Sequence, residues 1–161
     1  MRKQLLEQLK SLNINYKIKE HPPVATVQEA REHWKDVPGT HCKNLFLRDK
    51  RGKQHYLVVL EKDQPFSFDT INEILGNEKV SFASERRLMK HLQLTPGSVT
   101  PFGVISDTEN HVIVLLDEQL KTSELINFHP NINTATVTLS FSDFERFMHQ
   151  CGNTFKYLDL S

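Results

Sequence analysis

The sequence has few cysteines, no net charge and no long apolar segment. Its 161 residues include only two cysteines, Cys42 and Cys151, with neither a CxxC pair nor a zinc-type spacing. Two free thiols in a reducing compartment are therefore expected. Lys plus Arg and Asp plus Glu both number 20, which argues against a protein that binds nucleic acid through a broad basic face. Short basic clusters at 50–53 and 86–87 leave contacts to RNA phosphates open.

Several chemical signatures are also absent. The eight histidines form no HExxH motif and no tight cluster with Cys or Asp along the chain, so no metal site and no cofactor are expected. There is no G-x-S-x-G, Walker A or dinucleotide-binding motif. No apolar stretch approaches the ~20 residues that cross a bilayer. The N-terminal MRKQLLEQLKSL interrupts its apolar pattern with charges, unlike a signal peptide. Together these absences predict a soluble cytoplasmic protein with no membrane partner.

The patterns that are present predict a single domain over residues 1–161. A hydrophobic content of 38% allows a substantial core. Apolar spacing and capping residues predict helices over 2–12, 26–34, 69–75, 84–92 and 142–152. Strands are expected over 16–19, 44–47, 56–60, 80–83, 104–105, 112–116, 125–128 and 134–139. The second and third strands are expected to pair as one hairpin and the fifth and sixth as another. We expect Asp69 and Ser84 to cap their helices. The expected fold is an α/β domain with a mixed, curled central sheet surrounded by helices.

Lys43 stands out because it leads into an apolar run after a glycine turn, in the segment GTHCKNLFL over 39–47. A lysine in this place is paired, extended to solvent or directed into a cleft. From its spacing alone, the ordinary interpretation is a strand-edge lysine with its ammonium group in water. Strand alternation predicts that the side chains of Lys43 and Asn44 point to opposite faces.

A second unusual segment is TPGSVTPFG, over 95–103. Two glycines and two prolines within nine residues predict a stiff, shaped loop. Read alone, such a loop is an ordinary connection between a helix and a hairpin. A lysine that faced it would form a site for a polar, anionic or carbonyl-bearing ligand.

Three segments in this order resemble the freestanding YbaK/ProX-type editing proteins, which are similar to the editing domain inserted in bacterial prolyl-tRNA synthetases. They are 38–47, 96–103 and 128–136, the last reading FHPNINTAT. The resemblance extends from the predicted helix start at Thr26 to the C-terminal helix. The chain departs from the family at Asn131, where an apolar residue is expected after His-Pro.

The resemblance implies a compact domain with a barrel-like mixed sheet and no cofactor. It implies hydrolysis of the ester between an amino acid and the tRNA 3′ terminal adenosine, with alanine on proline tRNA as the expected substrate. Lys43 matches the family's essential lysine, which would bind the terminal phosphate or sugar or stabilise developing negative charge. His129 matches a histidine that lines the pocket and limits its size. Asn44 is a second candidate site residue, which would act through its backbone or its side-chain amide.

By the same resemblance, loop amides would form an oxyanion hole and loop carbonyls would hold the amino acid's ammonium group. The candidate binding residues of the loop are Gly97, Ser98, Val99, Thr100, Pro101, Phe102 and Gly103. The expected partner is the 3′ acceptor end of a mischarged tRNA, and a prolyl-tRNA synthetase is left open as a second partner. Two alternatives remain at this point. One is the same chemistry on Cys- or Ser-charged tRNA, and the other is a non-catalytic tRNA- or synthetase-binding module.

Overall fold

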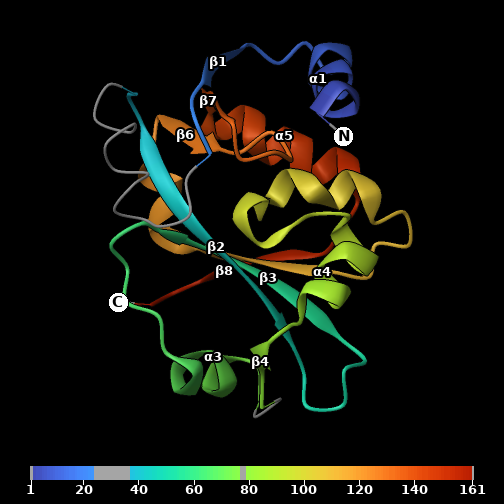
Figure 1. Ribbon diagram of the computed structural model, residues 1–161. Helices are drawn as coiled ribbons and strands as arrows, with labels where there is room; N and C mark the ends of the chain where they lie inside the picture. The colour runs from blue at the N-terminus through green and yellow to red at the C-terminus, as the bar shows by residue number, and fades with distance from the viewer. Residues whose placement is uncertain (1, 24–36, 77–78, 161) are drawn as a thin grey trace.

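A computed structural model describes residues 2–23, 37–76 and 79–160 of the chain (Figure 1). The helix predicted over 26–34 lies outside these residues. The strands are β1 (Tyr16–Glu20), β2 (Thr40–Arg48), β3 (His55–Glu61), β4 (Ser81–Phe82), β5 (Ile113–Asp117), β6 (Leu125–Phe128), β7 (Ala135–Ser140) and β8 (Phe155–Leu158). The α-helices are α1 (Arg2–Ser11), α3 (Phe68–Ile74), α4 (Glu85–Leu92) and α5 (Phe141–Cys151). Three 3₁₀-helices join them: η1 (Pro96–Ser98), η2 (Pro101–Ser106) and η3 (Glu118–Thr122).

The strands form one mixed sheet in the order β1-β7-β6-β2-β3-β5-β8, and β4 pairs with the end of β2. The pairs β1/β7, β6/β7 and β2/β3 are antiparallel, whereas β2/β6, β3/β5 and β5/β8 are parallel. The predicted α/β class and mixed sheet are therefore confirmed. The sheet is not closed, because β1 and β8 are the two ends of the path.

Helices cover the two faces of the sheet unequally. Apolar side chains of α1, α4 and α5 share the larger core with one face of the central strands. The other face carries a smaller core that includes Ile71 of α3, and in Figure 1 α3 and β4 lie together on the side of the sheet away from α5. Residues 55–60 of β3 are all buried, because its alternate side chains pack in the two cores. None of the described helices is long and apolar enough to cross a bilayer.

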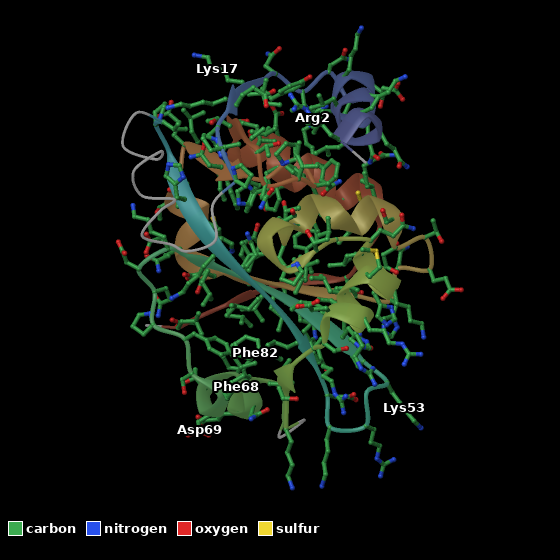
Figure 2. All side chains as sticks on the ribbon, in the orientation of Figure 1. Arg2, Lys17, Lys53, Phe68, Asp69 and Phe82 are labelled. Atoms are coloured by element: carbon green, nitrogen blue, oxygen red, sulfur yellow. The ribbon has the colours of Figure 1, made fainter. Side chains whose placement is uncertain are left out.

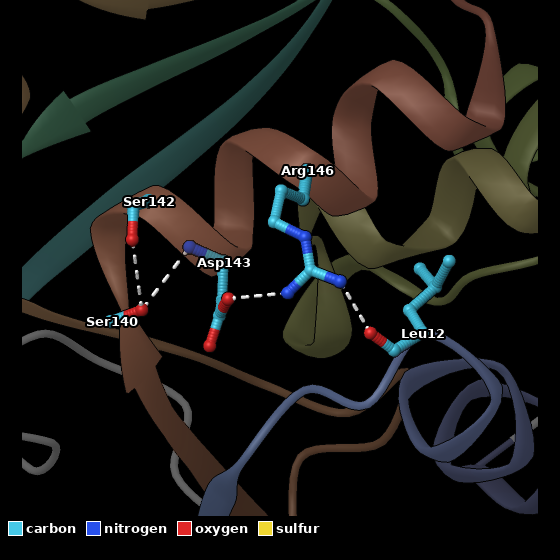
Figure 3. A network of polar contacts seen from close by, with 5 residues as sticks. All are labelled: Leu12, Ser140, Ser142, Asp143 and Arg146. Carbon is cyan, nitrogen blue, oxygen red and sulfur yellow. Dashed lines mark hydrogen bonds and ion pairs between the residues drawn. The ribbon is translucent and has the colours of Figure 1, made fainter.

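The start of α5 shows how local sequence fixes an element of the larger core (Figure 3). The Ser140 side chain accepts a hydrogen bond from the Asp143 amide at 3.1 Å, which caps the helix. Arg146, one turn on, donates to the Asp143 carboxylate at 2.8 Å and also to the Leu12 carbonyl after α1. This arginine therefore ties α5 to the N-terminal helix.

Two predictions about the fold are wrong. Residues 104–105 form no hairpin with 112–116, because 101–106 is the 3₁₀-helix η2 and β5 pairs in parallel with β3 and β8. Proline at the first position of η2 favours a helical turn and cannot donate to a strand ladder. The cap of α3 is Ser67, whose side chain accepts from the Thr70 amide at 3.4 Å, and not Asp69. The predicted cap of α4 is confirmed, since Ser84 accepts from the Arg87 amide at 3.2 Å.

Candidate active site

One edge of β2 is only partly paired, and this creates the site. Along its other edge, β2 pairs with β3 from Cys42 to Arg48. On the site edge, β6 pairs only at Thr40 and His41, and β4 pairs only at Leu47 and Arg48. Residues 42–45 therefore have no strand pairing on that edge within the described chain. The gap exposes the middle of β2 to the loop that carries 97–103.

Asn44 connects β2 to this loop. Its Nδ2 donates a hydrogen bond to the Val99 carbonyl at 3.1 Å. Its Oδ1 is buried and has no hydrogen-bond partner among the described residues. A buried amide oxygen without a partner is costly unless a ligand or water completes it. The Asn44 side chain therefore holds the loop with one atom and offers an acceptor with the other.

The two loop glycines are needed for close packing. Neither Gly97 nor Gly103 has a positive φ, so backbone conformation alone does not require glycine at these positions. A Cβ on Gly97 would lie 3.1 Å from Asn133 Nδ2, and one on Gly103 would lie 2.6 Å from Leu94 Cδ1. The loop thus passes tightly between the segment after β6 and the segment after α4.

Most of the loop is buried. Ser98, Thr100, Pro101 and Gly103 are buried, Val99 is half-buried and Gly97 is exposed. The Thr100 side chain accepts from the Phe102 amide at 3.3 Å, which caps η2. These contacts give the loop the stiffness that its prolines and glycines predict.

Phe102 anchors the loop in the core. Its side chain is fully buried, and its ring centroid lies 5.5 Å from that of Phe128 and 5.1 Å from that of Phe147. Both contacts are T-shaped, a favourable geometry for aromatic pairs. The sequence analysis grouped Phe102 with the ligand-binding residues. In the structure its side chain faces the protein interior, and its backbone amide already donates to the Thr100 side chain.

A small cavity lies beside Asn44. It has a volume of about 20 Å³ and is lined by His41, Cys42, Asn44, Asn127, Phe128, His129 and Thr136. We call it the β2–β6 cavity. A space of this size holds roughly one water molecule, and a methyl group is of comparable size. The cavity therefore has room for a very small apolar group beside polar atoms.

His129 is one of the residues that line this cavity. Its Nδ1 lies 3.1 Å from the Ala135 carbonyl, so Nδ1 carries the proton and Nε2 is left as the acceptor. Burial is the main cause that lowers the pKa of His129; the hydrogen bond to Ala135 opposes this, and the electrostatic interaction with His21 adds to it. The ring is thus neutral at neutral pH. His21 lies beside it, with ring centroids 6.1 Å apart.

The turn after His129 explains the unusual Asn131. Its φ is +64°, a left-handed conformation that asparagine tolerates better than an apolar side chain does. Its side-chain amide is buried and has no partner among the described residues. The departure from the family pattern is therefore compatible with the local backbone.

Lys43 lies on the opposite face of β2 from Asn44. Cross-strand neighbours place it opposite Leu60, and its alternating neighbours Leu45 and Leu47 pack with the smaller core. Its side chain is half-buried and does not line the β2–β6 cavity. It makes no hydrogen bond or ion pair with any described residue. The structure thus brings together Asn44, the loop and His129, and it leaves Lys43 across the strand.

Sequence reasoning missed several residues that line the cavity, above all Asn127. Its Nδ2 donates to the carbonyls of Pro38 and Thr40 at 3.0 and 3.2 Å, and its Oδ1 accepts from the Thr138 hydroxyl. These bonds fix the turn that leads into β2, where Gly39 has a φ of +98°. The sequence signal that could have identified Asn127 is its position as a polar residue within the apolar strand LINF.

The two cysteines are free and unsuited to nucleophilic catalysis. Burial is the largest cause that raises the pKa of both thiols, well above its usual range for Cys42 and to about 11 for Cys151. Thiolate, not thiol, is the nucleophile. Although Cys42 lines the cavity, it contributes a small apolar surface there.

A separate histidine cluster lies outside this site. His55, His91 and His111 each place a ring nitrogen within 4.8 Å of the others, a proximity that the linear sequence does not show. The two basic clusters noted in the sequence also meet here, because Arg87 donates to the Gly52 carbonyl at 3.1 Å. No residue of this cluster lines the β2–β6 cavity.

Comparisons with known proteins identify the family of this chain. Residues 21–147 match the model of the aminoacyl-tRNA editing domain family. The chain is 45% identical over 156 residues to the prolyl-tRNA editing protein ProX of Acetoanaerobium sticklandii, covering 97% of this chain and 95% of that protein. It is 36% identical to the prolyl-tRNA synthetase associated domain-containing protein 1 of Danio rerio, covering 96% and 84% of the two chains.

A solved structure shares the fold. It is a crystal structure assigned as a trans-editing enzyme for prolyl tRNA synthetase, with a TM-score of 0.71 and 16% identity over 98% of this chain and 96% of that chain. The family model covers most of the sequence, and both relatives match over nearly its full length. The chain therefore belongs to the aminoacyl-tRNA editing domain family, a family of aminoacyl-tRNA deacylases.

Proposed function

We propose that this protein hydrolyses alanine from mischarged proline tRNA, with the β2–β6 cavity receiving the alanine side chain. The observation that carries the proposal is the unpartnered Asn44 Oδ1 beside a cavity of about 20 Å³. An acceptor next to a methyl-sized space suits a small amino acid whose ammonium group needs a partner. The prolyl-tRNA editing protein ProX, a close relative, supports proline tRNA as the carrier.

Size exclusion gives the selectivity. The proline ring is too large for a space that holds about one water molecule. The correctly charged prolyl-tRNA is therefore not hydrolysed. Discrimination by attraction alone would supply only ~1–3 kcal/mol per methylene. Rigid walls reject the larger substrate more strongly, and the tight packing at Gly103 and the buried Phe102 keep the loop beside the cavity rigid.

The loop and Asn44 position the ester for attack by water. An aminoacyl ester is already activated, so the protein must mainly orient the carbonyl and stabilise the oxyanion. Water adds to the carbonyl carbon, the bond to the ribose oxygen breaks, and that oxygen leaves with a proton. The backbone amides of Gly97, Val99 and Thr100 are the proposed oxyanion donors, because those of Ser98, Phe102 and Gly103 already donate within the loop and Pro101 has no N–H. Asn44 Oδ1 and the loop carbonyls are the proposed acceptors for the ammonium group, and His129 lines the same small space.

In this proposal Lys43 does not contact the acyl group, unlike Asn44, the loop and His129. Because its side chain is on the far face of β2, we assign its ammonium group to the terminal phosphate or sugar of the tRNA. The unpaired edge of β2 at 42–45 lets the 3′ end cross from one face to the other. A lysine side chain with no partner among the described residues is well suited to phosphate.

A panel of charged tRNAs tests the function. Purified protein, without added metal, is incubated with Ala-, Cys-, Ser- and Pro-charged proline tRNA, and release of the amino acid is followed over time. We expect the alanyl ester to be hydrolysed more than about 200-fold faster than the prolyl ester, because attraction for one methylene gives only about 10–200-fold.

The other outcomes of the panel separate the alternatives. Faster release of cysteine or serine would assign the same chemistry to another amino acid. No release above the spontaneous rate from any of the tRNAs would contradict hydrolysis and leave a tRNA- or synthetase-binding module. Co-purification with a prolyl-tRNA synthetase would add that partner to the enzyme.

A further inference from the structure

We propose that His55, His91 and His111 form a binding site for a divalent transition metal ion, with zinc as the metal that best suits it. The three side chains come from different parts of the chain. His55 begins β3, His91 lies in the last turn of α4, and His111 precedes β5. A metal bound here would join three segments that the backbone does not connect directly.

The geometry is close to that of a three-histidine centre. One ring nitrogen from each residue lies within 4.8 Å of the other two, and His55 Nδ1 is already 2.9 Å from His111 Nε2. Nitrogen ligands at 2.0–2.1 Å in a tetrahedron lie about 3.3 Å apart, so small side-chain rotations complete the set. The fourth position is left for water.

The surroundings hold the ligands in place. His55 is buried and stacks on Phe46 at 5.5 Å, and the rings of His91 and His111 stack at 4.5 Å. The buried Asp107 carboxylate accepts a hydrogen bond from the His111 backbone amide at 3.1 Å. Its negative charge lies near the cluster and favours a bound cation.

The chemistry of the three side chains also suits a transition metal. Neutral imidazole is the metal-binding form. Imidazole nitrogen is a ligand that zinc and its neighbours prefer, in contrast to the oxygen ligands of magnesium and calcium.

Arg87 is the group that opposes the metal. Its guanidinium donates to His55 Nε2 at 3.1 Å and also to the Gly52 carbonyl. When a metal takes His55 Nδ1, the ring proton moves to Nε2, and Arg87 then retains only the Gly52 bond. Removal of the guanidinium should therefore strengthen metal binding.

A metal at this position would stabilise the loop over 95–103, which we call the editing loop. The last turn of α4, with His91, is followed within a few residues by the loop that begins at Thr95. Fixing His91 to β3 and to the start of β5 fixes the approach to Val99, whose carbonyl binds Asn44. The site is thus structural in character and independent of the proposed substrate.

Zinc titration of the metal-free full-length protein tests the proposal, with calorimetry for stoichiometry and thermal unfolding as a second readout. We expect one zinc per chain, a Kd below about 10 µM and a rise in Tm of about 5 °C at saturating zinc. Cobalt bound in place of zinc should give the visible absorption of a tetrahedral centre.

Matched variants locate the site. His91→Ala and His111→Ala should each weaken zinc binding at least about 100-fold, a loss typical of a ligand. Arg87→Gln should bind zinc more tightly than the parent. His149→Ala, at an exposed histidine of α5, should bind zinc as the parent does. His91 is partly exposed at a helix end, so its variant serves even if the His111 variant does not fold.

Three results would overturn the proposal. They are the absence of one-to-one zinc binding by the parent, zinc binding that His91→Ala retains in full, and zinc binding that His149→Ala loses.

Discussion

Lys43→Ala is expected to abolish detectable deacylation of Ala-tRNA(Pro), a loss of about 100-fold or more in kcat/KM. A loss of this size in kcat/KM is expected when one partner of a charge-assisted contact to phosphate is removed. Lys43 makes no hydrogen bond or ion pair with a described residue, so the loss would reflect the substrate and not the fold. The loss should appear largely as a raised KM, because the contact is made to the tRNA end and not to the reacting carbonyl.

The control for this variant is Lys156→Ala, at an exposed lysine of β8. It removes the same charge from the net total and should leave kcat/KM within about threefold of the parent. Single-turnover release from both variants, with circular dichroism to confirm folding, makes the comparison. If Lys43→Ala deacylated the tRNA as fast as Lys156→Ala, the assignment of this lysine to the substrate would fail.

Phe102→Ala is expected to destabilise the protein by about 3–5 kcal/mol, the usual loss for a fully buried phenylalanine. The side chain is 0% exposed and makes T-shaped contacts with Phe128 and Phe147. Its removal leaves a void beside the editing loop, which the surrounding aromatic rings cannot fill without moving. Urea unfolding followed by circular dichroism measures the change.

Phe82→Ala is the matched control for this loss. Phe82 of β4 is 57% exposed. It lies beside Phe68 of α3 (Figure 2), and the two ring centroids are 5.1 Å apart. Its truncation should cost about 1 kcal/mol or less, because surface substitutions away from buried contacts have small effects. A Phe102 variant as stable as the Phe82 variant would mean that the loop is not anchored through the core.

Local signals predicted most of the fold. The apolar spacing of α1, the Ser84 cap of α4 and the unbroken apolar run of β3 each depend on residues close together in the sequence. The predicted second hairpin failed because Val104 and Ile105 are apolar in either conformation. Proline at the start of η2 and the burial of Phe102 decide in favour of the 3₁₀-helix. The strand β8 was missed, since it depends on parallel pairing with β5.

The candidate site was predictable only in part, because some of its residues lie in short sequence motifs and others meet only in the fold. Motif resemblance brought Asn44, the loop and His129 into one group, and the structure places them around a common cavity or in direct contact. Strand alternation predicted that Lys43 and Asn44 diverge, but it could not show which of them faces the loop. The histidine cluster has no sequence signal, because His55, His91 and His111 are 20 or more residues apart and meet only through the packing of α4 on β3 and β5.

The central claim is that the acyl group binds at the β2–β6 cavity, and chemical-shift mapping tests it most directly. The probe is an adenosine that carries alanine through a non-hydrolysable 3′-amide, added to isotopically labelled full-length protein. The largest amide shifts are expected at Asn44, Gly97, Val99 and His129, with the prolyl analogue producing much smaller changes at the same positions. Shifts confined to the opposite face of β2, around Leu60 and Ile71, or equal shifts with both analogues, would contradict the account.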